Sequence, residues 1–84
     1  MGYGYITFRS VTHAQGGERI LQERGIRCAL QRTPRWMEEQ GCGYCLRLRE
    51  RELSRAGELL RKGRISYRKI YRVDEHGQLV EAMV

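Results

Sequence analysis

TPRWMEEQGCGYC, residues 33–45, is the segment that joins two stretches of ordinary amphipathic pattern. It holds the only proline, the only tryptophan and two of the three cysteines of the 84-residue chain. Thr33-Pro34 ends a preceding strand, because proline has no N–H to donate to a ladder. Gly41 and Gly43 lead into the strand that follows. We therefore expect a connection between two strands here, and any chemistry of this chain is expected to be thiol chemistry in it.

Before this segment, the pattern predicts a strand, a helix and a second strand. Residues 3–8 are apolar, aromatic and β-branched, as is typical of a strand. Ser10 or Thr12 offers an N-cap for a helix with apolar residues at helical spacing, and Gly25 is placed to end it. Residues 26–31 then alternate, with Ile26, Cys28 and Leu30 on one face, which predicts the second strand.

After the segment, the pattern predicts a third strand and a second helix. Residues 44–49 alternate leucine or tyrosine with cysteine or arginine, as in a strand with one buried face. Leu53, Ala56 and Leu60 recur at helical spacing, and Gly63 closes the helix.

Residues 66–73 read as a fourth strand, followed by a turn at 74–77. Residues 79–84 read as either a short edge strand or a tail. The order β-α-β-β-α-β predicts an α+β fold of the ferredoxin-like, split βαβ type, a four-stranded antiparallel sheet with both helices on one face. We expect a single domain over 1–84 with its core in 3–73.

Composition narrows the class of protein. Sixteen Lys and Arg against ten Asp and Glu give a net charge of +6, which is either a solvated basic surface or an attraction for an anion. No apolar run approaches the roughly 20 residues that span a bilayer, and the N-terminus does not read as a signal peptide. The expected address is the cytoplasm, where the three cysteines are reduced thiols or functional groups.

The predicted topology brings distant residues to one edge of the sheet. In this fold the first helix begins where the second strand ends and the third strand starts, so three segments are expected to converge: residues 10–13, 33–36 and 42–45. A helix N-terminus carries unpaired N–H groups and about half a positive charge, which stabilises a thiolate or a bound anion. Arg9 and Arg35 add positive charge there, and His13 is a candidate proton acceptor.

Several of these motifs, in this order and spacing, resemble the putative Se/S carrier protein-like family of small bacterial proteins. The resemblance covers about residues 3–73 and rests on Tyr5-Ile6-Thr7-Phe8, Ser10, Thr12-His13-Ala14, Gly25-Ile26, Thr33-Pro34-Arg35 and Cys42-Gly43. It implies a cysteine that carries sulfur or selenium as a persulfide or selenosulfide. By motif position, Cys42 matches the family cysteine, Gly43 its glycine, and Thr33, Pro34 and Arg35 its preceding motif.

The chain departs from the family pattern at Gln40-Gly41-Cys42-Gly43, where members often have Ser-x-Cys-Gly, and it adds Cys45 to make a Cys-x-x-Cys. A second thiol could attack a persulfide on Cys42 and release the cargo as hydrosulfide. Cys28, on the same strand face as the apolar Ile26 and Leu30, is expected in the core.

Two other uses of the Cys-x-x-Cys are weaker. A thioredoxin-like site opens a helix and needs a downstream proline, whereas here the motif enters a strand and the proline lies upstream. A structural zinc site wants four ligands, and this motif supplies two unless His13 or a symmetric dimer adds more. We therefore expect no metal.

An alternative class is a basic binding module for RNA or another polyanion. Residues 61–72 interleave tyrosines with arginine and lysine, a pattern of stacking and phosphate-binding surfaces. Against it, RNA-recognition domains of this fold class use aromatics on their central strands, in a motif absent here, and the pattern also suits a cationic edge strand. A small regulatory domain that dimerises through its sheet, with incidental cysteines, is a third reading.

The sequence favours the carrier over a complete enzyme, because it has no recognisable cofactor site, and no cofactor is expected. Cys42 is predicted to be the attacking thiolate, Arg35 and His13 to stabilise the anion, and Cys45 to resolve or release. The expected partners are sulfur or selenium donors, such as a cysteine desulfurase, and acceptor proteins. A homodimer stays open, nucleic acid is the less favoured partner, and no membrane is expected.

Overall fold

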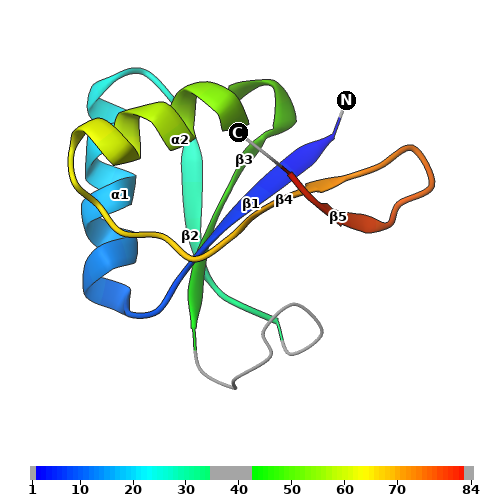
Figure 1. Ribbon diagram of the computed structural model, residues 1–84, viewed down its shortest axis with the longest axis horizontal. Helices are drawn as coiled ribbons and strands as arrows, with labels where there is room; N and C mark the ends of the chain where they lie inside the picture. The colour runs from blue at the N-terminus through cyan, green and yellow to red at the C-terminus, as the bar shows by residue number, and fades with distance from the viewer. Residues whose placement is uncertain (1, 35–42, 83–84) are drawn as a thin grey trace.

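Five antiparallel strands and two α-helices build the part of the chain that the structure, a computed structural model, describes: residues 2–34 and 43–82. Both helices lie on one side of the sheet (Figure 1). The elements follow in the order β1 (Tyr3–Phe8), α1 (Val11–Glu23), β2 (Cys28–Arg32), β3 (Tyr44–Arg49), a short 3-10 helix η1 (Glu50–Glu52), α2 (Leu53–Lys62), β4 (Ile70–Val73) and β5 (Leu79–Glu81).

The sheet has the order β2-β3-β1-β4-β5, so β1 and β3 are central. Their register pairs Tyr3 with Arg49 at one end and Phe8 with Tyr44 at the other. Successive side chains of a strand point to opposite faces. One face of these two strands therefore carries every second residue from Gly4 and Leu48, and the other face carries the residues between them.

The core fills the space between the helices and the first of these faces. Its buried side chains form one cluster, which removes apolar surface from water at about 25 cal/mol per Å²: Ile6, Phe8, Ala14, Leu21, Ile26, Leu46, Leu48, Leu53, Ala56, Leu60 and Ile70. Gly4 lies under Leu53, and a Cβ there would overlap that side chain. The glycine thus lets α2 begin close against β1.

The helix ends follow local chemistry. Ser10 has an extended backbone and its side chain accepts a hydrogen bond from the His13 N–H, which caps α1 as predicted. Gly25, with φ +81°, takes the left-handed conformation just after α1. At the end of α2, however, Gly63 has φ −83°, and the left-handed residue is Arg64 with φ 58°.

The sheet corrects the predicted strand count, which was four. The fifth strand, β5, pairs with β4 because the intervening turn is well specified. The Asp74 carboxylate accepts hydrogen bonds from the N–H groups of His76 and Gln78, and Gly77 supplies a positive φ. The residues expected as either edge strand or tail therefore include an edge strand.

Two strand boundaries also differ from the prediction. β2 occupies Cys28–Arg32, two residues later than expected, since Ile26 N–H bonds to the Leu21 carbonyl and closes the end of α1. β4 begins at Ile70 instead of residue 66. Just before β4, the Thr7 N–H donates to the Lys69 carbonyl, and the Thr7 hydroxyl also bonds to the Lys69 backbone. These bonds replace regular strand pairing at this point.

Candidate functional site

The end of the sheet next to the 34–43 connection is the candidate site, and we call it the loop end. Phe8 lies opposite Tyr44, and the Thr33 N–H donates to the Gly43 carbonyl at 3.0 Å. The start of α1 and the adjoining ends of β2 and β3 thus share the lower end of the sheet in Figure 1. The predicted convergence is confirmed for residues 10–13, 33–34 and 43–45.

The structure describes five of the seven predicted site residues. Gly43 is buried just before β3, and Pro34 is half-buried shortly after β2. Arg35 and Cys42, the predicted anion-binding arginine and reactive cysteine, lie outside the described residues.

The N-terminus of α1 supplies the positive end of a helix dipole at the loop end. Ser10 Oγ lies 2.7 Å from His13 Nδ1 and accepts from the His13 N–H at 3.3 Å. His13 is exposed and fixed by these two contacts. An imidazole held next to free helix N–H groups suits the binding of an anion.

A basic hollow opens beside this helix start. Its volume is about 480 Å³, and it is lined by Arg9, His13, Ser66, Tyr67, Arg68 and Lys69. Sequence reasoning included Arg9 and His13 but placed Arg68 and Lys69 in a separate basic stretch. The antiparallel pairing of β4 with β1 explains their position, because the start of β4 must lie beside the end of β1.

Cys45 is fully buried at the loop end, on the sheet face away from the helices. Its register partner Thr7 is 4% exposed, and Thr33 is 6% exposed. Burial raises the pKa of the Cys45 thiol, and the neighbouring Thr33 hydroxyl offsets part of that rise. That hydroxyl makes no hydrogen bond of ordinary geometry within the described chain, so its contact with the sulfur is a loose one.

Cys28 lies at the far end of β2 and takes no part in the loop end. It is half-buried against the core, as its sequence position predicted, and its Sγ is 4.0 Å from the Glu18 carbonyl. Burial, followed by the Glu18 charge, raises the pKa of this thiol from 9.0 to about 11. Both described thiols are therefore protonated at neutral pH and poor nucleophiles.

Among residues 2–34 and 43–82, no group of three or more His, Cys, Asp or Glu side chains is arranged to hold a metal ion. No helix in the same ranges combines the length and the apolarity needed to cross a membrane.

Comparison with known proteins gives one match. The sequence model of the family described as putative Se/S carrier protein-like matches residues 3–72, which is most of the chain. No curated protein and no solved structure matches.

Proposed function

The chain belongs to the putative Se/S carrier protein-like family, and from this we propose that it carries sulfur or selenium from a donor protein to an acceptor protein. We place the cargo on Cys42 as a persulfide or selenosulfide. The family membership is the observation that carries the proposal, and the chemistry of the loop end supports it.

Loading is a transfer of sulfane sulfur without net oxidation. The Cys42 thiolate attacks the terminal sulfur of a persulfide on the donor, a new S–S bond forms on Cys42, and the donor S–S bond breaks. The donor leaves as a thiolate, and the proton of its persulfide passes to the new one or to water. Selenium in the terminal position follows the same course.

Described residues at the loop end support the proposal that Cys42 holds an anion. Gly43, which follows Cys42 in the chain, shares this edge with the capped N-terminus of α1. Arg9 and His13 line the hollow beside that helix start, and Arg35 completes the predicted set of cations. Positive charge and a helix N-terminus both lower the pKa of a nearby thiol and stabilise a bound persulfide anion.

Cys45 has a narrower role than a freely reacting resolving thiol. Its attack on the inner sulfur of a Cys42 persulfide would form a Cys42–Cys45 disulfide and release hydrosulfide, so two thiols are oxidised as the cargo is reduced. Because Cys45 is buried and its pKa is raised, we propose that this internal release is slow and that an acceptor thiol takes the cargo first.

Intact mass spectrometry tests the proposal. The reduced protein is loaded with a small-molecule persulfide, or with its analogue that has selenium in the terminal position, and its mass is recorded before and after dithiothreitol. We expect a reducible gain of about 32 Da, or about 79 Da for selenium, on the wild type and on Cys28→Ala and Cys45→Ala.

Cys42→Ala is expected to remain unloaded. Equal loading of Cys42→Ala, or loading that only Cys28→Ala abolishes, would contradict the assignment. The lifetime of the loaded state then tests release: slow internal release predicts similar lifetimes for the wild type and Cys45→Ala until an acceptor thiol is added.

A further inference from the structure

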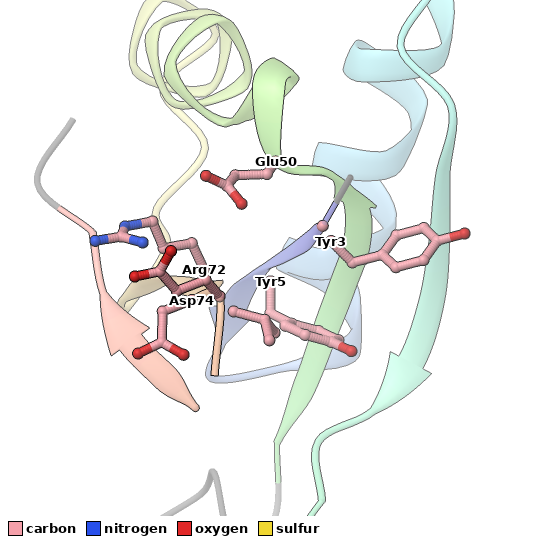
Figure 2. Close-up of a pocket in the computed structure, with 8 residues that line it drawn as sticks. Tyr3, Tyr5, Glu50, Arg72 and Asp74 are labelled. Atoms are coloured by element: carbon pink, nitrogen blue, oxygen red, sulfur yellow. The ribbon is translucent and has the colours of Figure 1, made fainter. Parts of the chain in front are cut away.

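The opposite end of the same sheet face presents aromatic and cationic side chains. Tyr3 and Tyr5 on β1 alternate with core residues, and Arg47 and Arg49 on β3 lie opposite them in register. Figure 2 shows both tyrosine rings pointing the same way from β1, away from Arg72. We call Tyr3, Tyr5, Arg47 and Arg49 the tyrosine end.

Tyr3 is unusually accessible for a residue of a central strand. It is 50% exposed, and no other large hydrophobic residue that the structure describes is exposed. The Arg47 guanidinium lies over its ring at 4.7 Å from the centroid, so one face of the ring is covered by a cation. The remaining surface is open for a second planar group.

Two hollows lie beside Arg49, the last residue of β3, and Tyr3 lines the first of them. One, of about 700 Å³, is lined by Gly2, Tyr3, Arg49, Glu50 and Arg51. The other, of about 360 Å³, is lined by Gly25, Arg27, Arg49, Arg51 and Glu52. Arg49 and Arg51 line both hollows, and we call the two hollows together the arginine groove.

The cations of this groove are available to a ligand. Arg27, Arg49 and Arg51 are exposed and make no ion pair with any residue in 2–34 or 43–82. In the same part of the chain, Glu52 is instead paired with Arg55 at 3.8 Å. Three guanidinium groups that lack an ion pair within the described residues, together with a half-exposed aromatic ring, match a polyanion that also carries planar groups.

We propose that the tyrosine end and the arginine groove bind single-stranded RNA. One base stacks on the face of the Tyr3 ring that Arg47 leaves free, and the following phosphates pair with Arg49, Arg51 and Arg27. Glu50 lines the hollow that contains Tyr3, and its carboxylate can accept a hydrogen bond from a ribose 2′-hydroxyl. That contact favours RNA over DNA.

Other occupants fit this surface less well. A second copy of the chain would place arginines against arginines, and this like-charge contact opposes a face-to-face dimer. A duplex keeps its bases stacked, so it cannot offer a base plane to Tyr3.

The structure also changes the argument made from the sequence. The sequence pattern points to an aromatic and cationic surface at residues 61–72. It contains no recognised RNA-binding motif of aromatic residues on the central strands. The register places Tyr3 and Tyr5 on the central strand β1, beside arginines of β3. RNA binding is independent of the carrier proposal, because the tyrosine end lies at the opposite end of β1 from the loop end.

Fluorescence anisotropy with a labelled eight-nucleotide oligouridine tests the proposal at low and at physiological salt. Arg49→Gln/Arg51→Gln is compared with Arg19→Gln/Lys62→Gln, which removes the same charge from exposed positions on α1 and α2. We expect the groove pair to lose about tenfold or more in affinity and to show a salt slope shallower by about 1.4, at about 0.7 per lost phosphate contact. The control pair is expected to stay within about threefold.

Substitutions of Tyr3 separate stacking from charge. Tyr3→Leu is expected to weaken binding on the order of tenfold, and Tyr3→Phe to keep it, because stacking needs the ring and not the hydroxyl. The matched oligodeoxyuridine is expected to bind more weakly, and Glu50→Gln to reduce this preference, since an amide is a poorer acceptor.

Three results would overturn the proposal: no binding at low salt, equal losses for the two charge-matched pairs, or equal affinity for RNA, DNA and inorganic polyphosphate. Circular dichroism of each variant confirms that it is folded. Cys42→Ala is expected to bind RNA as the wild type does, so a failure of the carrier proposal and a failure of this one are distinguishable.

Discussion

The loop end and the tyrosine end belong to the same face of the same two strands, yet they differ in almost every physical property. At the loop end, Thr7 and Cys45 are 4% and 0% exposed. At the tyrosine end, a few residues along the strands, Tyr3 is 50% exposed and Arg49 is exposed. One surface thus changes from buried and weakly polar to open and cationic.

The difference teaches that strand alternation assigns a face but not an environment. Cys45, Arg47 and Arg49 occupy equivalent alternate positions of β3, away from the helices. Only the first is buried. A thiol at the buried position is protonated and protected, whereas the guanidinium groups of the half-buried Arg47 and the exposed Arg49 keep their charge and their hydrogen-bond donors.

The largest expected effect on the free energy of unfolding comes from placing the same negative charge at each end. Cys45→Glu puts a carboxylate at a fully buried position, and we expect it to lower the free energy of unfolding by about 3–5 kcal/mol. Arg47→Glu, two residues along the same face, is expected to change it by less than about 1 kcal/mol. Urea unfolding of both variants measures the contrast.

Cys45→Val controls for the loss of the thiol alone and is expected to be tolerated, because it keeps the site apolar. Similar unfolding midpoints for Cys45→Glu and Arg47→Glu would remove the distinction between the two ends.

A smaller effect is expected from removing one hydroxyl at each end. The Thr7 hydroxyl accepts from the Lys69 N–H at 3.1 Å and donates to the Lys69 carbonyl at 3.3 Å. Thr7→Val removes both contacts in a buried place and should cost about 1–3 kcal/mol. Tyr5→Phe, on the same strand, is expected to cost less than about 0.5 kcal/mol. A thermal or urea midpoint unchanged in Thr7→Val would show that these bonds contribute nothing net.

Much of the fold could be predicted from local signals. Residues 3–8 have the apolar, aromatic and β-branched composition of a strand, and residues 44–49 have its alternation. Ser10 and Gly25 have the chemistry of helix caps, so these boundaries are right. The start of β4 was wrong because the Thr7 side chain, 62 positions away, replaces part of the ladder. No local pattern reports such a contact.

The candidate site divides in the same way. The meeting of residues 10–13 with 43–45 followed from the order of elements alone. The burial of Cys45 and the accessibility of Tyr3 did not, because each depends on what lies over one part of a sheet face. The arginine groove could be identified only once the strand register was known, because the register sets Tyr3 opposite Arg49.

Titration of Cys28 tests how burial changes the pKa of a thiol at a third position. Its pKa of about 11, against an ordinary 9.0, leaves roughly a hundredfold less thiolate at pH 8 than in the unfolded chain. We therefore expect iodoacetamide to label it about a hundredfold more slowly in folded Cys42→Ala than in urea, with the folded rate rising about tenfold per pH unit toward 11.

The same shift has a consequence for stability. The folded state holds the Cys28 proton more tightly than the unfolded state, so this stabilisation is complete below about pH 9 and is lost as the pH rises toward 11. The unfolding midpoint should fall more steeply over this range in the wild type than in Cys28→Ala. Parallel pH profiles would contradict the raised pKa.

The smallest expected effect is the coupling between Tyr3 and Arg47 at the open end. With the guanidinium 4.7 Å from the ring centroid at a partly solvated site, the cation–π contact should contribute about 0.5–1 kcal/mol. A double-mutant cycle with Tyr3→Leu and Arg47→Gln isolates it by urea unfolding. The coupling should change little when a base stacks on the free side of the ring, because stacking does not require the guanidinium to leave. If saturating oligouridine instead abolishes it, Arg47 has moved from the ring to a phosphate, and the tyrosine end rearranges on binding.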